Sequence, residues 1–301
     1  MGGQRTTGRL LQVWRAQRGF TIVEVLIVLA VTGALFVAAA ILISGKQNQA
    51  GFNQAIQQLQ SQIQQVMNDV STGYFPGGAS FTCSAPAGGP VTISGVGANG
   101  QGANAGCIFA GKVLQFRVSG TNPEAYNILT VAAAQKNASG QEATSLGTAT
   151  PKVVAPALGS PANFPNLTTS TILQNGLAVS TSPNPAVNMW YNNGGANLAV
   201  GAVAIVTSFA GYAPNGSINS GSQQLSIVPV TGTTLGMTPT AAATAINANL
   251  AASATALTNP TNGVSVCFAS GGTNQSGLIT IGGGGHPLAV TLKVFQGSRI
   301  C

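Results

Sequence analysis

The feature that most constrains this chain is an apolar segment close to its N-terminus. Residues 20–44 form a run of 25 positions that contains a single charged side chain, Glu24. An α-helix rises about 1.5 Å per residue, so a run of this length can cross a hydrocarbon core of roughly 30 Å. The sequence therefore predicts one membrane-spanning helix over residues 20–44.

Positive charge directly before this segment predicts its orientation. Four of the 11 Lys and Arg residues of the chain lie in the first 19 positions, and no acid lies among them. They are Arg5, Arg9, Arg15 and Arg18. Because cytoplasmic flanks of membrane helices carry an excess of Lys and Arg, we expect the N-terminus in the cytoplasm and residues 45–301 outside. The apolar run is also longer than that of an ordinary secretory signal, which has about 7–15 apolar residues.

Glu24 is an expensive residue to place in such a segment. A carboxylate at the bilayer centre costs about 2.5–3.5 kcal/mol on insertion scales, and the cost falls toward the ends of the span. Two interpretations follow from the physics alone. Either Glu24 has a functional partner within the membrane, or its side chain reaches back to the polar interface.

Charged side chains are scarce in the whole chain, at 11 Lys and Arg and 4 Asp and Glu, or 5% of 301 residues. Typical soluble domains are roughly 25% charged. So few cations cannot build a dense basic face, and we expect no sequence-specific binding of nucleic acid. With one histidine, His286, and no CxxC or metal-ligand spacing, we expect no enzyme, no cofactor and no metal site.

The junction at residues 18–24 reads RGFTIVE and leads directly into the apolar segment. This junction resembles the class III signal of type IV prepilins and pseudopilins. In that family the prepilin peptidase cuts after the glycine and methylates the new terminal amine. The resemblance implies processing between Gly19 and Phe20, with Glu24 matching the family's glutamate near the mature N-terminus. Gly33 also falls where the family often has glycine.

The resemblance implies a structural subunit of a type IV pilus-like surface filament. The chain would reside in the inner membrane in contact with lipid, and an inner-membrane assembly platform would add it to identical subunits. The amine of Phe20 in one copy would neutralise Glu24 of a neighbour, which offsets the cost of burying that charge. An alternative within the family is a minor pilin or pseudopilin of a type II secretion or DNA-uptake machine. An alternative of a different class is a single-pass membrane-anchored binding or adhesion module that does not polymerise.

Residues 46–72 are rich in Gln and Asn and carry apolar residues spaced alternately four and three apart, which places them on one helix face. These are Phe52, Ile56, Leu59, Ile63, Val66 and Val70. We therefore expect one long helix over residues 20–72, apolar in its first half and amphipathic in its second. Residues 1–19 would be a cleaved basic leader, and residues 73–301 a globular domain.

Patterns after residue 73 predict a β-rich domain. Strands are expected at 112–119, 126–133, 186–191, 198–209, 224–230, 264–269, 278–281 and 288–296. The first two should form a hairpin, and residues 136–170 are expected to be loop. Thr238 and Pro239 are typical of a helix start, which we place over residues 239–257. The prediction is an α+β fold in which a long N-terminal helix packs on a mostly antiparallel sheet.

All four cysteines follow the apolar segment: Cys83, Cys107, Cys267 and Cys301. An even number in an exported domain favours disulfides, and four cysteines allow three pairings that the sequence does not separate. We prefer the local pairs Cys83–Cys107 and Cys267–Cys301, because the second bridge would tie down a C-terminus that otherwise frays. The frequent disulfide near the C-terminus in the pilin family agrees with this choice.

Overall fold

The computed structural model describes residues 20–73, 81–85, 91–95, 106–116, 124–143, 147–154, 168–180, 189–193, 195–207, 225–232, 237–253, 263–270, 274–283 and 289–297. The chain divides into two compact units, residues 1–47 and residues 48–301. One helix, α1 (Ile22–Ser71), supplies residues to both units.

Helix α1 confirms the long helix expected from the sequence, within two residues at its start and one at its end. Its C-terminus is closed by Gly73, which has a positive φ of 66° and donates its backbone N–H to the carbonyl of Val70 at 3.2 Å. Glycine is favoured there because the left-handed conformation that ends a helix is strained for residues with a Cβ. The local sequence thus ends α1 where the apolar stripe stops.

Residues 48–301 form an α+β unit with two main antiparallel sheets. We name them the β4 sheet and the β12 sheet, after the strands β4 (Ala125–Ala134) and β12 (Val264–Ser270). The strand order of the β4 sheet is β11-β10-β3-β4-β5, with β6 also paired to β4. The strand order of the β12 sheet is β14-β13-β12-β8-β9, with β7 also paired to β12. A separate pair consists of β1 (Phe81–Ser84) and β2 (Thr92–Gly95). The β4 sheet contains β3 (Cys107–Phe116), β4 (Ala125–Ala134), β5 (Lys152–Val154), β6 (Thr168–Ile172), β10 (Ala202–Thr207) and β11 (Leu225–Val230). The β12 sheet contains β7 (Leu177–Val179), β8 (Met189–Asn193), β9 (Ala196–Ala199), β12 (Val264–Ser270), β13 (Gln275–Ile281) and β14 (Val290–Gln296).

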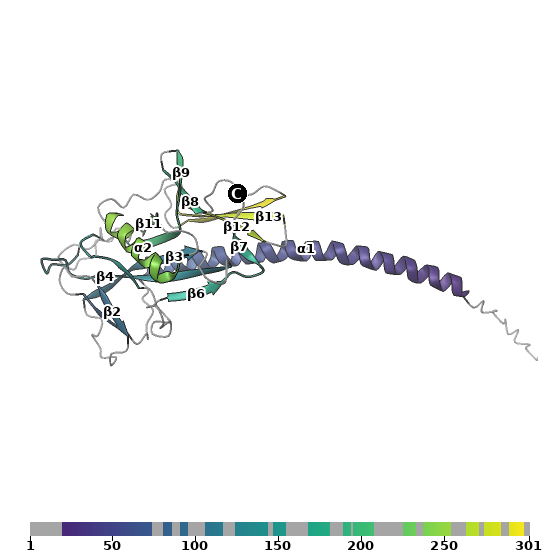
Figure 1. The fold of residues 1–301 in the computed structure, drawn as a ribbon, viewed down its shortest axis with the longest axis horizontal. Coiled ribbons are helices and arrows are strands. Elements are labelled where there is room, and N and C mark those ends of the chain that lie inside the picture. The colour runs from purple at the N-terminus through teal and green to yellow at the C-terminus, as the bar shows by residue number, and fades with distance from the viewer. Residues whose placement is uncertain are drawn as a thin grey trace, which may run out of the picture. The chain divides into compact units, whose positions relative to one another are not determined.

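Four strands of the β4 sheet are buried on both faces because they are apolar at most successive positions; these strands are β3, β4, β10 and β11. Along β3, Leu114 and Phe116 belong to the core shared with α1, whereas Val113 belongs to a second core beneath helix α2 (Pro239–Ser253). Alternate residues of a strand point to opposite faces, which explains the division. Figure 1 shows α2 lying across the strands of this sheet.

The core on the α1 side unites the helix with both sheets. It contains the buried stripe of α1 together with side chains of the β4 sheet and of the β12 sheet, such as Phe116 and Phe268. The rings of these two residues meet edge to face with centroids 5.7 Å apart. The second half of α1 is therefore packed by residues from two sheets.

Several sequence expectations are confirmed. The strands β3 and β4 form the expected antiparallel hairpin, in which Phe116 pairs with Tyr126. Helix α2 begins at Pro239, and Thr238 caps it by accepting the Ala241 N–H on its hydroxyl at 3.3 Å. The α+β class is likewise confirmed.

Other expectations need correction. Two six-stranded sheets stand where the sequence suggested one, and residues 136–170 contain β5 and the start of β6 rather than loop alone. The single strand expected at 198–209 is two strands that belong to different sheets. The chain crosses between them at one peptide: the Val200 N–H donates to Met189 in the β12 sheet, and the Gly201 N–H donates to Val230 in the β4 sheet. Apolar content alone could not reveal this crossing, because residues 198–206 carry no polar side chain on either side of it.

Candidate functional site

The start of α1 is closed by a hydrogen-bonded box between Thr21 and Glu24. The backbone N–H and the hydroxyl of Thr21 both donate to Glu24 Oε2, at 3.1 and 3.2 Å. In return the Glu24 N–H donates to Thr21 Oγ1 at 3.2 Å. This reciprocal arrangement is a capping box, which satisfies backbone donors that a helix start otherwise leaves free.

The first half of α1 is apolar on all sides and has no cover within its own unit. Every residue from 22 to 44 is exposed, and Phe20, just before the helix, is 82% exposed. The helix is long and apolar enough to cross a membrane by length and composition. A helix that is apolar all round is stable only when something apolar surrounds it. This half of α1 must therefore contact lipid or other protein.

The second half of α1 presents one apolar face to the core. Its fully buried residues repeat the stripe that the sequence predicted, with Ala55 and Met67 added: Phe52, Ala55, Ile56, Leu59, Ile63, Val66, Met67 and Val70. Gly277 on β13 allows the close approach, because a Cβ at that position would lie 2.0 Å from Cδ1 of Ile56. The absence of a side chain at Gly277 thus makes room for Ile56 against the β12 sheet.

Polar residues on the two flanks of the buried stripe attach α1 to the sheets. Gln60 Nε2 donates to the carbonyl of Val290 on β14 at 2.9 Å. On the other flank, the Tyr126 hydroxyl on β4 donates to Gln62 Oε1 at 2.6 Å. At about 100° per residue, Gln60 and Gln62 lie on opposite sides of the stripe. One flank is thus bonded to the β12 sheet and the other to the β4 sheet.

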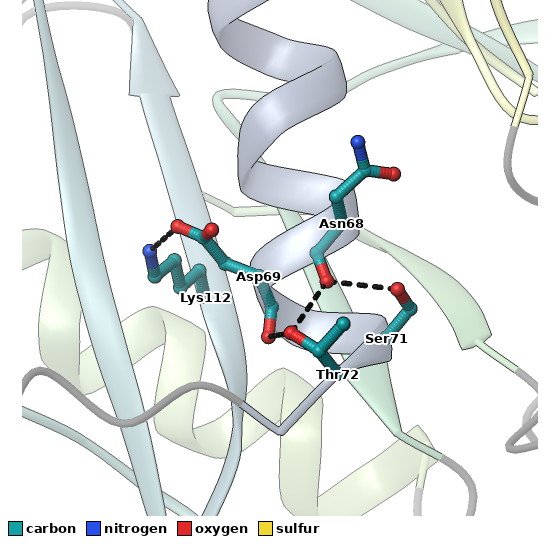
Figure 2. Close-up of polar contacts among 5 residues, drawn as sticks. All are labelled: Asn68, Asp69, Ser71, Thr72 and Lys112. Carbon is teal, nitrogen blue, oxygen red and sulfur yellow. Dashed lines mark hydrogen bonds and ion pairs between the residues drawn. The ribbon is translucent and has the colours of Figure 1, made fainter.

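An ion pair fixes the last turn of α1 to strand β3. Lys112 Nζ and Asp69 Oδ2 are 2.6 Å apart, and the two side chains are 11% and 24% exposed. Figure 2 shows Asp69 reaching toward Lys112 while the neighbouring amide of Asn68 points away. The hydroxyls of Ser71 and Thr72 donate to the Asn68 carbonyl and satisfy this end of the helix.

Burial raises the pKa of Tyr126, and a hydrogen bond with the side chain of Thr171 lowers it in part. The phenol is removed from water between β4 and α1, so its neutral form is favoured. The neutral hydroxyl is also the form that donates to Gln62. The packing of α1 on β4 therefore also favours the protonated form of Tyr126.

The cysteines lie at strand positions in the second unit. Cys107 begins β3, and Cys267 is buried on β12; both are disulfide-bonded rather than free thiols. A Cβ added at Gly106 would lie 3.4 Å from the carbonyl of Ala85, so the start of β3 passes beside the end of β1, which carries Cys83. Which cysteine each one binds stays a prediction, and Cys301 lies outside the described residues.

Of the residues assigned to processing and assembly, Phe20 and Glu24 are described, whereas Gly19 lies outside the described residues. The single histidine, His286, also lies outside them. The capping box was not among the sequence expectations, although the Thr-x-x-Glu spacing at residues 21–24 is its signature. The flanking contacts of α1 were not expected either, because no local pattern identifies a strand partner. Within the described part of the chain, no His, Cys, Asp and Glu side chains cluster as a metal site would require.

Comparison with known protein families gives one match. Residues 14–40 match the family described as the prokaryotic N-terminal methylation motif. No curated protein and no solved structure matches the chain. The motif and the long apolar helix that contains most of it support a type IV pilin-like or pseudopilin-like protein, in which the helix serves as a membrane anchor.

Proposed function

We propose that this chain is a structural subunit of a type IV pilus-like surface filament. Prepilin peptidase cuts the precursor after Gly19 and methylates Phe20, and an inner-membrane assembly platform then adds the subunit to identical copies. The observation that carries the proposal is the methylation motif over residues 14–40 leading into an apolar helix that is exposed along its whole first half.

The surroundings of the apolar half change during this cycle. Before assembly, lipid surrounds residues 22–44, with the N-terminus in the cytoplasm and the second unit outside. After assembly, the same residues pack against copies of themselves in the filament. Both surroundings are apolar, so one exposed helix surface serves in each.

Glu24 is suited to pairing with a neighbour while it caps its own helix. Both hydrogen bonds from Thr21 go to Oε2, and among the described residues no donor contacts Oε1. The amine that cleavage creates on Phe20 of another copy would bind Oε1. An unpaired charge buried between helices is strongly destabilising, so this pair would set the position at which an incoming subunit stops.

The first experiment examines the chain as the cell makes it. Mass spectrometry of the mature N-terminus should find N-methylated Phe20, and electron microscopy of sheared surface material should find filaments that contain the chain. An intact Met1, or a cut beyond residue 44, would contradict the proposal. The localisation follows from the same fractions, with the precursor in the inner membrane and the mature chain in the filament.

Three variants separate the charge of Glu24 from its capping role. Glu24→Gln can keep the capping box but loses the charge, so we expect normal cleavage and at least a tenfold loss of filaments. Glu24→Ala should behave in the same way. Thr21→Val removes the hydroxyl of the box and keeps the charge, so filaments should persist at a helix cost of about 0.5–2 kcal/mol. Normal filaments from Glu24→Gln would show that the charge pair is not needed.

Disulfides would stabilise the second unit, residues 48–301. We propose the local pairs Cys83–Cys107 and Cys267–Cys301, each worth roughly 2–4 kcal/mol. The course of β1 beside the start of β3 supports the first pair. Peptide mapping without reduction identifies both, and a Cys107–Cys267 peptide would contradict this assignment.

A further inference from the structure

The exposed face of the second half of α1 carries a stripe of uncharged polar side chains, which we call the amide stripe. It lies opposite the buried stripe and spans about 100° of the helix circumference. Its members are Gln54, Gln57, Gln58, Ser61, Gln65 and Asn68. None of these six side chains has a hydrogen-bond partner among the described residues. The flanking residues Gln60 and Gln62, by contrast, are bonded to the sheets.

The chemistry of this stripe differs from that of an ordinary solvated helix face. Such faces usually carry Lys and Glu, which add solubility and form stabilising pairs three or four residues apart. Between residues 47 and 68 this helix has no charged residue. The nearest acid, Asp69, is already paired with Lys112. The exposed face therefore lacks the charges that keep a surface dispersed in water.

Each amide of the stripe is both a donor and an acceptor. A carboxamide offers two N–H donors and a carbonyl oxygen. A row of amides is consequently complementary to another copy of the same row, at several offsets along the helix and without charge repulsion. A row of Lys or of Glu would repel its own copy.

We infer that the amide stripe is a contact surface between copies of this chain, on which α1 of a second copy packs through amide–amide hydrogen bonds. The inference rests on the proposed filament function and deepens it. It assigns a subunit contact to the second half of α1, in addition to the contact of the apolar first half. The occupant is a second copy because the face is neutral, self-complementary and continuous along one helix with the segment that needs such copies.

The decisive experiment places charge on the stripe of the full-length chain. Gln58→Lys with Gln65→Lys should leave cleavage after Gly19 intact and lower the yield of sheared filaments at least tenfold. Gln58→Glu with Gln65→Glu should give the same loss. Because both positions are exposed, the circular dichroism and melting temperature of the detergent-solubilised chain should not change.

Mixing the two charged variants tests the nature of the partner. Cells that express the Lys and Glu forms together should recover filaments that contain both, because opposite charges then face each other. Recovery would not occur if the stripe contacted lipid or an unrelated protein, and its absence would overturn the inference. Normal filaments from either charged form alone would also overturn it.

The control adds the same number of charges elsewhere. Ser139→Lys with Gln141→Lys alters two exposed turn positions whose hydrogen bonds in the described residues come from the backbone, and filaments should form as in the wild type. Loss of filaments from this control would show a general effect of charge and overturn the inference. Failure of the proposed function is distinguishable, since the wild-type chain itself would then show no cleavage after Gly19 and no filament.

Discussion

The two halves of helix α1 have the same backbone and opposite requirements. Residues 22–44 are apolar on every side and exposed, whereas residues 52–70 are apolar on one side that is completely buried. The sheets of the second unit supply the partner of the later half from the same chain. The earlier half has none within its own unit and must take one from lipid or from other protein. One helix thus combines a half that is packed by its own chain with a half that is not.

The largest expected loss of stability comes from removing a buried side chain from the second half of α1. Ile56→Ala should destabilise the chain by about 2–5 kcal/mol, because Ile56 is fully buried beside Gly277. The matched change Ile27→Ala lies in the exposed half and should leave the free energy of unfolding nearly unchanged. Urea unfolding of both variants in detergent measures the difference. Equal losses would contradict the division of roles between the halves.

The ion pair at the end of the buried half should give a smaller effect. Asp69→Asn leaves Lys112, whose side chain is 11% exposed, without its carboxylate. We expect a loss of about 2 kcal/mol, below the roughly 3–5 kcal/mol of fully buried pairs, because Asp69 is partly hydrated.

A second substitution tests whether the loss comes from the pair. In a background that carries Lys112→Met, the change Asp69→Asn should cost much less, which a double-mutant cycle by thermal unfolding would measure. An equal cost in both backgrounds would mean that Asp69 acts without Lys112.

The smallest expected effect on stability comes from Tyr126, which is bonded to the flank of α1, at high pH. Because burial raises the pKa of Tyr126 in the folded chain, the unfolded chain loses this proton first as the pH rises past about 10. Stability from this group is therefore complete below pH 10 and declines above it. Tyr126→Phe should lose the bond to Gln62, worth about 0.5–1.5 kcal/mol. The same variant should lose less stability than the wild type as the pH rises above about 10. An unchanged loss would mean that other groups cause it.

Much of the fold follows from local patterns. The spacing of the apolar residues from Phe52 to Val70 placed α1 and chose its buried face, and Gly73 ended it. Thr238 and Pro239 started α2. These features are predictable because helix periodicity and capping depend on residues a few positions apart.

The pairing of strands was far less predictable. The change of sheet at Val200 and Gly201, and the strands β5 and β6 within a supposed loop, depend on partners that lie 11 to 47 residues away in the chain. Likewise, Gly277 has no turn to make and matters only because Ile56 arrives beside it. Neither composition nor periodicity carries that information.

By itself, the sequence predicted a processing junction at Gly19 and Phe20, and it determined the membrane-length apolar segment and the amphipathic continuation of the same helix. Each depends on the order of nearby residues and on the cost of placing them in lipid or water. Only the tertiary structure decided that two sheets pack against α1, that Lys112 neutralises Asp69, and that Gln60 and Gln62 are bonded while the amide stripe is not. The physical reason is that a polar side chain on a helix forms a hydrogen bond within the chain only where a strand distant in sequence places a partner beside it.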